Sequence, residues 1–322
     1  MVEIKNITDK NEWNLLLTKN CTYSVFSSFE WGEYKKTGGW TVERLAFYNS
    51  GNFLGQCQFI YKRKYSAIIS WNSGGILYSN STHLESIAEA IKEYFQSPFS
   101  YMRFYFYNVS EGKNLFEIIE TFSRPKKFIN SNFSIAHMFS PQFDILKSMN
   151  SNHRYYYKQA IKNNFSFKVN PADNIDDFIH VHNDMTKSKE LLHLKINPSD
   201  IMQLVASFEE NILIFTVYLD EEPVASCLVL LNGKKAFYYL AASSSLGRKT
   251  YASYYMVKEL FEYLSSIGIE NFDFGGITPY NKEAHGVNKF KEGFGGEIVN
   301  YLGEWETSTS SLLSLLVNKV YL

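Results

Sequence analysis

Apolar and polar residues follow the same order in two separate parts of the chain. In the first part, the apolar runs 56–61 and 65–71 stand on either side of the basic turn Lys62-Arg63-Lys64. In the second part, the runs 224–231 and 236–242 enclose Asn232-Gly233. Asn-Gly between two apolar runs is typical of a tight β-hairpin, because both residues tolerate a positive φ angle. The pattern therefore predicts one β-hairpin in each half of the chain.

A helical pattern and a further strand follow each predicted hairpin. The helix-like segments are residues 83–96 and 252–267, and the strands are residues 101–107 and 271–274. This repeated order predicts an α/β fold with two domains, each a mixed β-sheet flanked by helices. We place the first domain at about residues 1–147 and the second at about residues 148–300. The junction at 141–150 is polar and short, so we expect the domains to touch and the functional site to lie in a cleft between them.

The composition indicates a folded protein of balanced charge. The chain has 322 residues, of which 45% are hydrophobic, and this is ample material for two cores. Its 32 basic and 33 acidic residues exclude a generally basic protein that coats nucleic acid, and no DNA contact is expected. Cys21, Cys57 and Cys227 are far apart and lack ligand spacing. They predict a reducing compartment, no metal site and no prosthetic group.

The two ends of the chain differ in character. The polar start, and the absence of an apolar run long enough to span a bilayer, predict a cytoplasmic protein without a transmembrane segment. The apolar stretch 311–317 could rest on a membrane as a peripheral contact. Such a stretch more often packs on its own domain, and we favour that interpretation.

The chemically most informative stretch joins a glycine turn to a single lysine. The run Asp273-Phe274-Gly275-Gly276-Ile277 is typical of a buried strand that ends in a turn. Phe290 stands thirteen residues after Ile277, and Lys291 follows it, before a segment rich in glycine and phenylalanine. A partly desolvated lysine in such surroundings can stabilise negative charge on a reacting carbonyl, or lose its proton. The alternative is a solvated lysine in an ordinary surface loop.

A basic helix is predicted from about residue 152. Arg154, Lys158 and Lys162 recur every fourth residue and so share one helical face. Three cations in a row repel one another unless an anion relieves them, so the face could bind phosphate, with Arg154 making a bidentate contact. The alternative is a solvated helix face.

Three segments of the chain, in the same order, resemble the Fem family of peptidoglycan-bridge aminoacyl transferases. The stretch 269–304 resembles the C-terminal signature of that family, with Phe-Lys-x-Gly-Phe before a last strand. The stretch 154–164 resembles its basic helix, and Phe29-Glu30-Trp31-Gly32-Glu33-Tyr34-Lys35, with Trp40, resembles its aromatic first helix. The resemblance implies a fold of two Gcn5-related N-acyltransferase (GNAT)-like domains, with residues 301–322 completing the first.

The resemblance also implies roles for single residues. In the family, a cation of the first helix and the arginine of the basic helix grip the diphosphate of a nucleotide- or lipid-linked acceptor. These roles carry over onto Lys35 and Arg154, with Lys36 as the alternative to Lys35 and Lys158 as a further acceptor contact. Tyr34 is left open as a substrate contact, and we expect Trp31 to be core.

The donor that the resemblance implies is an aminoacyl-tRNA, a co-substrate rather than a bound cofactor. Phe290 would pack against its terminal adenosine, and Lys291 would stabilise charge at the reactive carbonyl. The chain departs from the family in two ways. It lacks the long helical hairpin with which some members hold tRNA, and the strand at 102–107 lacks the usual acidic residue.

Acyl-CoA is the alternative donor for this fold. CoA-binding members cradle pyrophosphate on a glycine-rich turn at a helix start. Here Arg248 is followed by Tyr251, at a position where that pattern calls for glycine. Ser253 stands where the pattern calls for glycine or alanine. The bulk of Tyr251 disfavours CoA at this position.

Three functions remain open from the sequence. The first is an aminoacyl transferase that forms an amide on an amine of a cell-envelope precursor. The second is an acyl-CoA-dependent N-acyltransferase that acts on an amino sugar in surface-polysaccharide biosynthesis. The third is a non-catalytic member of the fold.

Overall fold

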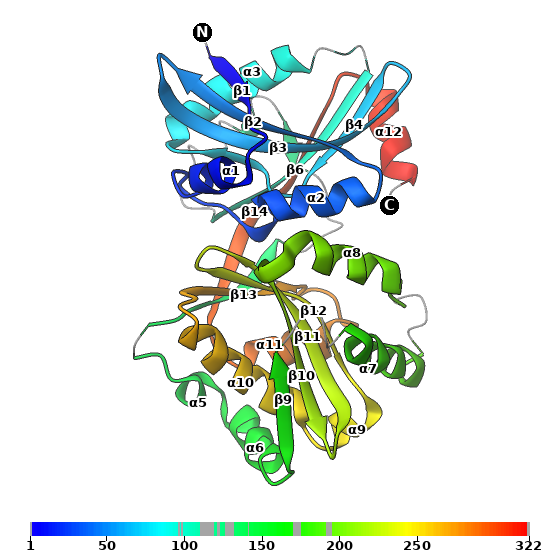
Figure 1. The fold of residues 1–322 in the computed structure, drawn as a ribbon. Helices are drawn as coiled ribbons and strands as arrows, with labels where there is room; N and C mark the ends of the chain where they lie inside the picture. Colours follow the sequence, from blue (N-terminus) through cyan, green and yellow to red (C-terminus); the bar gives the residue numbers. More distant parts are fainter. Residues whose placement is uncertain are drawn as a thin grey trace. The chain divides into compact units, whose positions relative to one another are not determined.

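The computed structural model describes residues 2–95, 97, 99–109, 119–120, 123–125, 132–140, 142–169, 175–190 and 195–320. The chain divides into two compact units, shown in Figure 1. The first unit comprises Met1–Asn132 and Asn300–Leu322, and the second comprises Phe133–Val299. The domain boundary expected near residue 147 thus differs from the division after Asn132, because the strand at 133–138 pairs within the second unit.

The first unit is built on a mixed sheet with the strand order β1-β2-β3-β4-β6-β14, in which β5 pairs with β3 and β7 with β14. Neighbours are antiparallel except β4 and β6. The strands are β1 Glu3–Asn6, β2 Thr41–Asn49, β3 Asn52–Lys64, β4 Ala67–Asn72, β5 Ile76–Tyr78, β6 Phe99–Val109, β7 Arg124–Pro125 and β14 Glu297–Ser308.

Helices cover both faces of this sheet (Figure 1). They are α1 Lys10–Leu17, α2 Phe29–Thr37, α3 Leu84–Tyr94 and α12 Ser311–Val320, with the short 3-10 helices η1 Val25–Ser27 and η2 Ser81–His83. Strand alternation separates two cores. Leu45 and Phe47 of β2 pack with α3, whereas Ala46 between them packs with α1.

The second unit has its own mixed sheet, with the strand order β8-β13-β12-β11-β10-β9. The strands are β8 Phe133–Met138, β9 Phe165–Val169, β10 Ile212–Leu219, β11 Glu222–Asn232, β12 Lys235–Ser243 and β13 Asn271–Ile277. Neighbours are antiparallel except β12 and β13. The pairing between β12 and β13 covers only Lys235–Phe237 and Asn271–Asp273, so the two parallel strands separate beyond Phe237.

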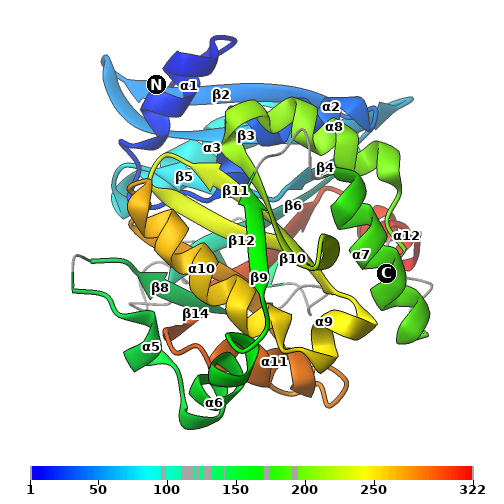
Figure 2. The same ribbon diagram turned by 60° about the horizontal axis from the view of Figure 1, so that its bottom comes forward.

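The helices of the second unit are α5 Ile145–Ser148, α6 Ser151–Ala160, α7 Ile175–Ser188, α8 Pro198–Phe208, η4 Glu209–Asn211, α9 Ser245–Lys249, α10 Ala252–Ser266 and α11 His285–Glu292. Helix α10 supplies Met256, Leu260 and Phe261 to the main core, while α7 packs on β10, β11 and β12. Figure 2 shows α10 running across the sheet, with α6 and α11 near its N-terminal end.

The predicted fold class is confirmed: each unit is a mixed sheet flanked by helices, and both predicted hairpins form. Two local predictions are wrong. Strand β3 runs through Lys64, and the turn lies at Tyr65-Ser66, where Tyr65 has a φ of +54°. Helix α6 ends at Ala160, so Lys162 lies beyond the helical face of Arg154 and Lys158.

Some expectations concern helix length and segment ends. In the described ranges, no helix exceeds the 15 residues of α10, in agreement with the expected lack of a helical arm. None of the described helices combines the length and the apolar character that crossing a bilayer requires. Gln96 and Pro141, at the ends of the predicted helix 83–96 and of the junction 141–150, lie outside the described residues.

Candidate functional site

The ammonium of Lys291 lies at the end of β13. Helix α11 carries this lysine, and the buried side chain of Asn288 fixes the helix to the strand end. Its amide donates to the carbonyl of Thr278 at 2.9 Å and accepts from the Thr278 N–H at 3.1 Å. One turn further along α11, the Lys291 Nζ donates to the carbonyl oxygen of Gly276 at 2.9 Å.

A sharp turn in β13 makes room for this lysine. Gly275 has a φ of +78°, which L-residues with a side chain rarely adopt. Asp273 supports the turn, because its carboxylate accepts from the Gly275 N–H at 2.8 Å and from the hydroxyl of Ser134. A Cβ at position 275 would also lie 3.4 Å from the Lys291 Nζ, so glycine permits the close approach of the ammonium.

Burial and charge act in opposite directions on Lys291. Its side chain is half-buried, and burial lowers the pKa of Lys291 to about 8, while the negative charge of Asp273 offsets part of this effect. The lysine is therefore mainly protonated at neutral pH, and it loses its proton under mildly alkaline conditions. The prediction of a partly desolvated lysine at this position agrees with the geometry.

The ammonium lies where two parallel strands separate. The last paired residues of β12 and β13 are Phe237 and Asp273, and the hydrogen bond of Lys291 goes to Gly276, just past that pair. The Tyr238 carbonyl and the Phe237 ring also approach Gly275 from β12. A cation beside diverging strand ends can stabilise negative charge on the oxygen of a substrate that enters between them.

Helix α6 is fixed to the segment that carries Lys291. The Nε2 atom of the buried His153 ring lies 2.9 Å from the carbonyl oxygen of Phe290. The Asn150 N–H donates a hydrogen bond to the Gly293 carbonyl at 2.9 Å. A Cβ on Gly293 would fall 1.9 Å from the His153 ring. Burial lowers the pKa of His153, and the hydrogen bond to the Phe290 carbonyl offsets part of this effect.

The remaining predicted residues of the second unit lie on or next to these elements. The Phe290 ring is half-buried and packs against Tyr254 and Phe294 at centroid distances of 5.5 and 5.1 Å. Arg154 is exposed on α6, and its guanidinium donates to the Met149 carbonyl. Lys158 is also exposed on α6. The contacts of Phe290 with adenosine and of Arg154 and Lys158 with phosphate stay predictions.

The predicted residues of the first unit lie on α2. The Lys35 Nζ lies over the rings of Trp31 and Tyr34, at 4.4 and 5.0 Å from their centroids. Trp31 is buried, as expected for a core residue. Lys36 instead forms an ion pair of 2.8 Å with Glu33, which also binds Arg44 at 2.7 Å.

The predicted residues are thus divided between the units. Lys291, Phe290, Arg154 and Lys158 belong to the second unit, and the α2 cations belong to the first. The cleft expected between the domains stays a prediction.

Three supporting residues were missed by sequence reasoning. Asp273 stands as a single carboxylate in a buried strand, two residues before Gly275-Gly276, and this pattern could have suggested a role. Asn288 and His153 had no such signal. Their partners, Thr278 and Phe290, are 10 and 137 residues away, and only the fold brings His153 to Phe290.

Two expected absences concern metals and CoA. Within the described residues, no group of three or more His, Cys, Asp or Glu side chains could hold a metal ion.

At the turn before α10, Tyr251 has a φ of +61°, the conformation that glycine favours. Its ring stacks on Tyr156, with centroids 5.1 Å apart and planes at 17°.

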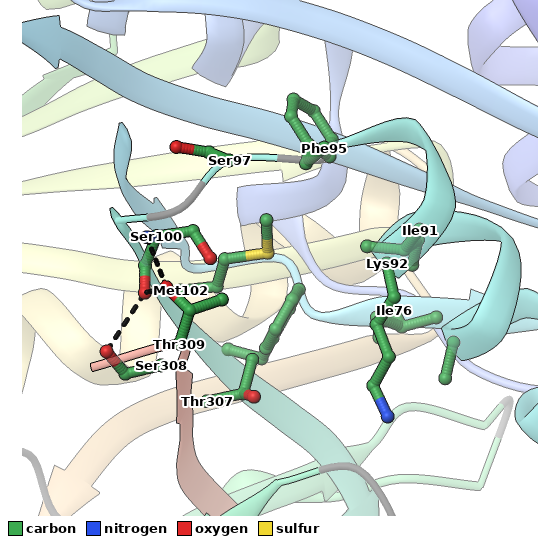
Figure 3. A pocket seen from close by; sticks show the side chains of 12 residues that line it. Ile76, Ile91, Lys92, Phe95, Ser97, Ser100, Met102, Thr307, Ser308 and Thr309 are labelled. Atoms are coloured by element: carbon green, nitrogen blue, oxygen red, sulfur yellow. Dashed lines mark hydrogen bonds between the residues drawn. The ribbon is translucent and has the colours of Figure 1, made fainter. Parts of the chain in front are cut away.

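The first unit also contains an apolar cavity of about 260 Å³ between α3 and the sheet (Figure 3). Ile91, Phe95 and Met102 contribute to its lining. Hydroxyl groups at one side already have partners, since the Ser308 Oγ donates to the Ser100 carbonyl at 2.9 Å. None of the predicted acceptor-binding residues lines this cavity, so it is not the predicted phosphate site.

Comparisons with known proteins agree with the resemblance. The FemAB family matches residues 214–321. The aminoacyltransferase FemA of Staphylococcus aureus is 29% identical over 89 residues, which are 27% of this chain and 21% of FemA. The match thus spans about a fifth of the length of that relative.

Solved structures extend the likeness to the whole chain. A crystal structure of FemX superposes with a TM-score of 0.83 at 16% identity and covers 99% of both chains. A tandem GNAT protein from the clavulanic acid biosynthesis pathway superposes with a TM-score of 0.55 at 8% identity, covering 96% of this chain and 99% of its own. At these identities the likeness shows the fold, which is a tandem of two GNAT-like domains.

Proposed function

We propose that this FemABX-like chain is an aminoacyltransferase that forms an amide bond on a cell-envelope precursor of the peptidoglycan-bridge type. The observation that carries the proposal is the half-buried ammonium of Lys291, held at the point where β12 and β13 separate. This lysine lies within the segment that matches the FemAB family. The relative that aligns with part of the chain is itself named an aminoacyltransferase.

The proposed reaction is aminolysis of an activated acyl group. The lone pair of an acceptor amine attacks the carbonyl carbon of an aminoacyl ester, and a C–N bond forms. The carbonyl oxygen becomes an oxyanion in the tetrahedral intermediate, and the Lys291 ammonium stabilises that charge. The ester C–O bond then breaks, and the ribose hydroxyl of the tRNA leaves with the proton that the amine gives up. Neither a covalent enzyme intermediate nor a bound cofactor is needed.

The proposed substrates follow from two exposed cations of α6 and one half-buried cation of α2. Arg154 and Lys158 of α6 and Lys35 of α2 bind the phosphates of a nucleotide- or lipid-linked acceptor, with Tyr34 beside Lys35. Lys36, whose ammonium forms an ion pair with Glu33, is the alternative to Lys35. Aminoacyl-tRNA is the proposed donor, and Phe290 its adenosine contact. We place the reaction in the cytoplasm.

A second candidate function is acyl-CoA-dependent N-acylation of an amino sugar. One observation favours it: the backbone at Tyr251 keeps the left-handed conformation of a glycine-containing turn before α10. The Tyr251 side chain still occupies that turn, and we therefore rank this donor second. A non-catalytic role is the third outcome.

The test is a donor screen with the purified protein. Charged tRNAs and acyl thioesters are each paired with muramyl-peptide and amino-sugar nucleotides. Lys291→Met keeps the length and apolar stem of the side chain and removes its charge. We expect transfer from charged tRNA and a fall of about 10²–10³-fold in kcat for Lys291→Met. Lys289→Met, an exposed lysine on the same helix, is the matched control and should keep wild-type activity.

Three results would change the assignment. Turnover of a thioester without tRNA would support the second candidate. Wild-type kcat in a folded Lys291→Met protein would remove the lysine from the mechanism. Consumption of no donor at all would leave the non-catalytic role.

A further inference from the structure

Helix α12 presents three leucines to solvent, while two of its polar side chains, Ser314 and Asn318, face the protein. Leu312, Leu315 and Leu316 are 65%, 68% and 53% exposed. On the opposite side, Ser314 is buried, and its hydroxyl donates to the Glu306 carboxylate at 3.3 Å. Asn318, on the same side, donates to Glu306 at 3.5 Å.

In an ordinary surface helix the apolar stripe faces the core, whereas on α12 only Val317 is buried and Leu313 half-buried among the leucines and valines whose side chains are described. The polar contacts with Glu306 hold the helix in place, and Glu306 is itself buried and accepts from the hydroxyl of Tyr101 at 2.7 Å. The three exposed leucines, at spacings of three and one, lie together on one side of α12, and the described part of the chain leaves them open to solvent.

Positive charge and aromatic groups lie next to this surface in the first unit. Helix α12 has no acidic residue and carries the exposed Lys319 in its last turn. Val317 borders a small crevice together with Trp40 and Ile69, and the Lys62 Nζ lies over the Trp40 ring at 4.9 Å. Lys62 pairs with Ile69 in the β3–β4 hairpin, and Figure 1 shows α12, in red, beside β4.

The tip of the same hairpin adds two exposed side chains. Arg63, the next residue of β3 after Lys62, is exposed on the other face of the hairpin near its tip, and Tyr65 at the turn is 92% exposed. Leucines on a helix, flanked by cations and an exposed tyrosine, are the combination with which peripheral proteins enter a lipid headgroup region.

We propose that α12 and the tip of the β3–β4 hairpin dock the first unit on an anionic lipid surface. Leu312, Leu315 and Leu316 enter the boundary between headgroups and acyl chains, while Lys62, Arg63 and Lys319 bind anionic headgroups. A second copy of the chain is a less suitable partner. In a two-fold symmetric contact through this face, the cations of one copy would face the same cations of the other and repel them. The proposal does not depend on the transfer reaction.

The experiment is sedimentation of the full chain with vesicles of phosphatidylcholine alone or with about a third phosphatidylglycerol. We expect binding to the anionic vesicles that weakens in high salt, because screening reduces the headgroup attraction. The triple variant Leu312→Ser/Leu315→Ser/Leu316→Ser should bind at least about tenfold more weakly. Lys62→Gln/Arg63→Gln should weaken binding to anionic vesicles while changing binding to neutral vesicles little.

Matched variants separate this surface from general exposure. Leu15→Ser removes a leucine of α1 that is 63% exposed, and Lys5→Gln/Lys147→Gln removes two exposed charges elsewhere; both should bind as wild type does. Thermal unfolding verifies that every variant is folded. Equal binding by wild type and the triple variant overturns the proposal. Concentration-dependent dimerisation that the triple variant abolishes, without vesicle binding, also overturns it and identifies a second copy as the occupant.

Discussion

At the scale of single residues, the protonation of Lys291 decides what this site can do. Burial lowers the pKa of this lysine to about 8 from the usual 10.5, and the carboxylate of Asp273 raises it again in part. A cation that stabilises an oxyanion must be protonated, whereas a general base must be deprotonated. The two roles therefore predict opposite changes of rate with pH.

We expect kcat of the proposed transfer to fall as the pH rises through about 8, because the Lys291 ammonium then loses its proton. Asp273→Asn removes the charge that raises the lysine pKa and keeps an oxygen to accept from Ser134 and Gly275, so it should move the fall to lower pH. The measurement is the pH dependence of kcat in both proteins. A rate that rises through the same pH range would instead make Lys291 a base.

At the scale of secondary structure elements, the site depends on how closely α6 and α11 approach. Gly293, at the end of α11, leaves the space that the His153 ring of α6 fills. The contact between the two elements includes the His153–Phe290 and Asn150–Gly293 hydrogen bonds. The position of Arg154 relative to Lys291 follows from this packing, since Arg154 adjoins His153 on α6.

Gly293→Ala should destabilise the protein by about 1–3 kcal/mol, because its Cβ would lie 1.9 Å from the His153 ring and force the helices apart. The φ of Gly293 is −67°, so the backbone itself accepts alanine. Gly286→Ala on the same helix meets nothing within 4 Å and should be neutral, or stabilise by up to about 1 kcal/mol. Urea unfolding of the two variants checks the difference. Equal stability would show that the His153 ring moves aside without cost.

Sequence patterns predicted the positions of helices and strands better than the contacts between residues that are distant in the chain. The Asn232-Gly233 turn and the alternation of apolar runs were sufficient for both hairpins, because these signals are local. The end of α6 before Lys162 and the turn at Tyr65 were missed, since charge spacing alone does not show where a helix or strand stops. The contact of His153 with Phe290 joins residues 137 positions apart, and no local pattern encodes it.

At the scale of the whole molecule, the proposed acceptor contacts come from both units. Lys35 belongs to the first unit, and Arg154 to the second. If the two cations bind one diphosphate, their contributions to acceptor affinity are coupled. If they bind different groups, their contributions add.

We expect Lys35→Ala and Arg154→Ala each to raise KM for the acceptor about tenfold or more, because each removes a charged hydrogen bond to phosphate. The double variant should lose less than the sum of the two free energies. Lys36→Ala, which removes a cation already paired with Glu33, is the control and should change KM little. Kinetic measurement of all four proteins forms the cycle. Strict additivity would contradict a shared diphosphate.

Strand β14 has a consequence for the order in which the chain acquires its structure during translation. The strand begins at Glu297, in the last residues of the second unit, and pairs with β6 of the first unit from Tyr301 to Ser308. The ribosome therefore synthesises residues 133–299 before it synthesises β14, the strand that pairs with β6. The N-terminal sheet is complete only after the whole of the second unit has emerged, and until then an unpaired β6 edge is exposed to chaperones and to aggregation.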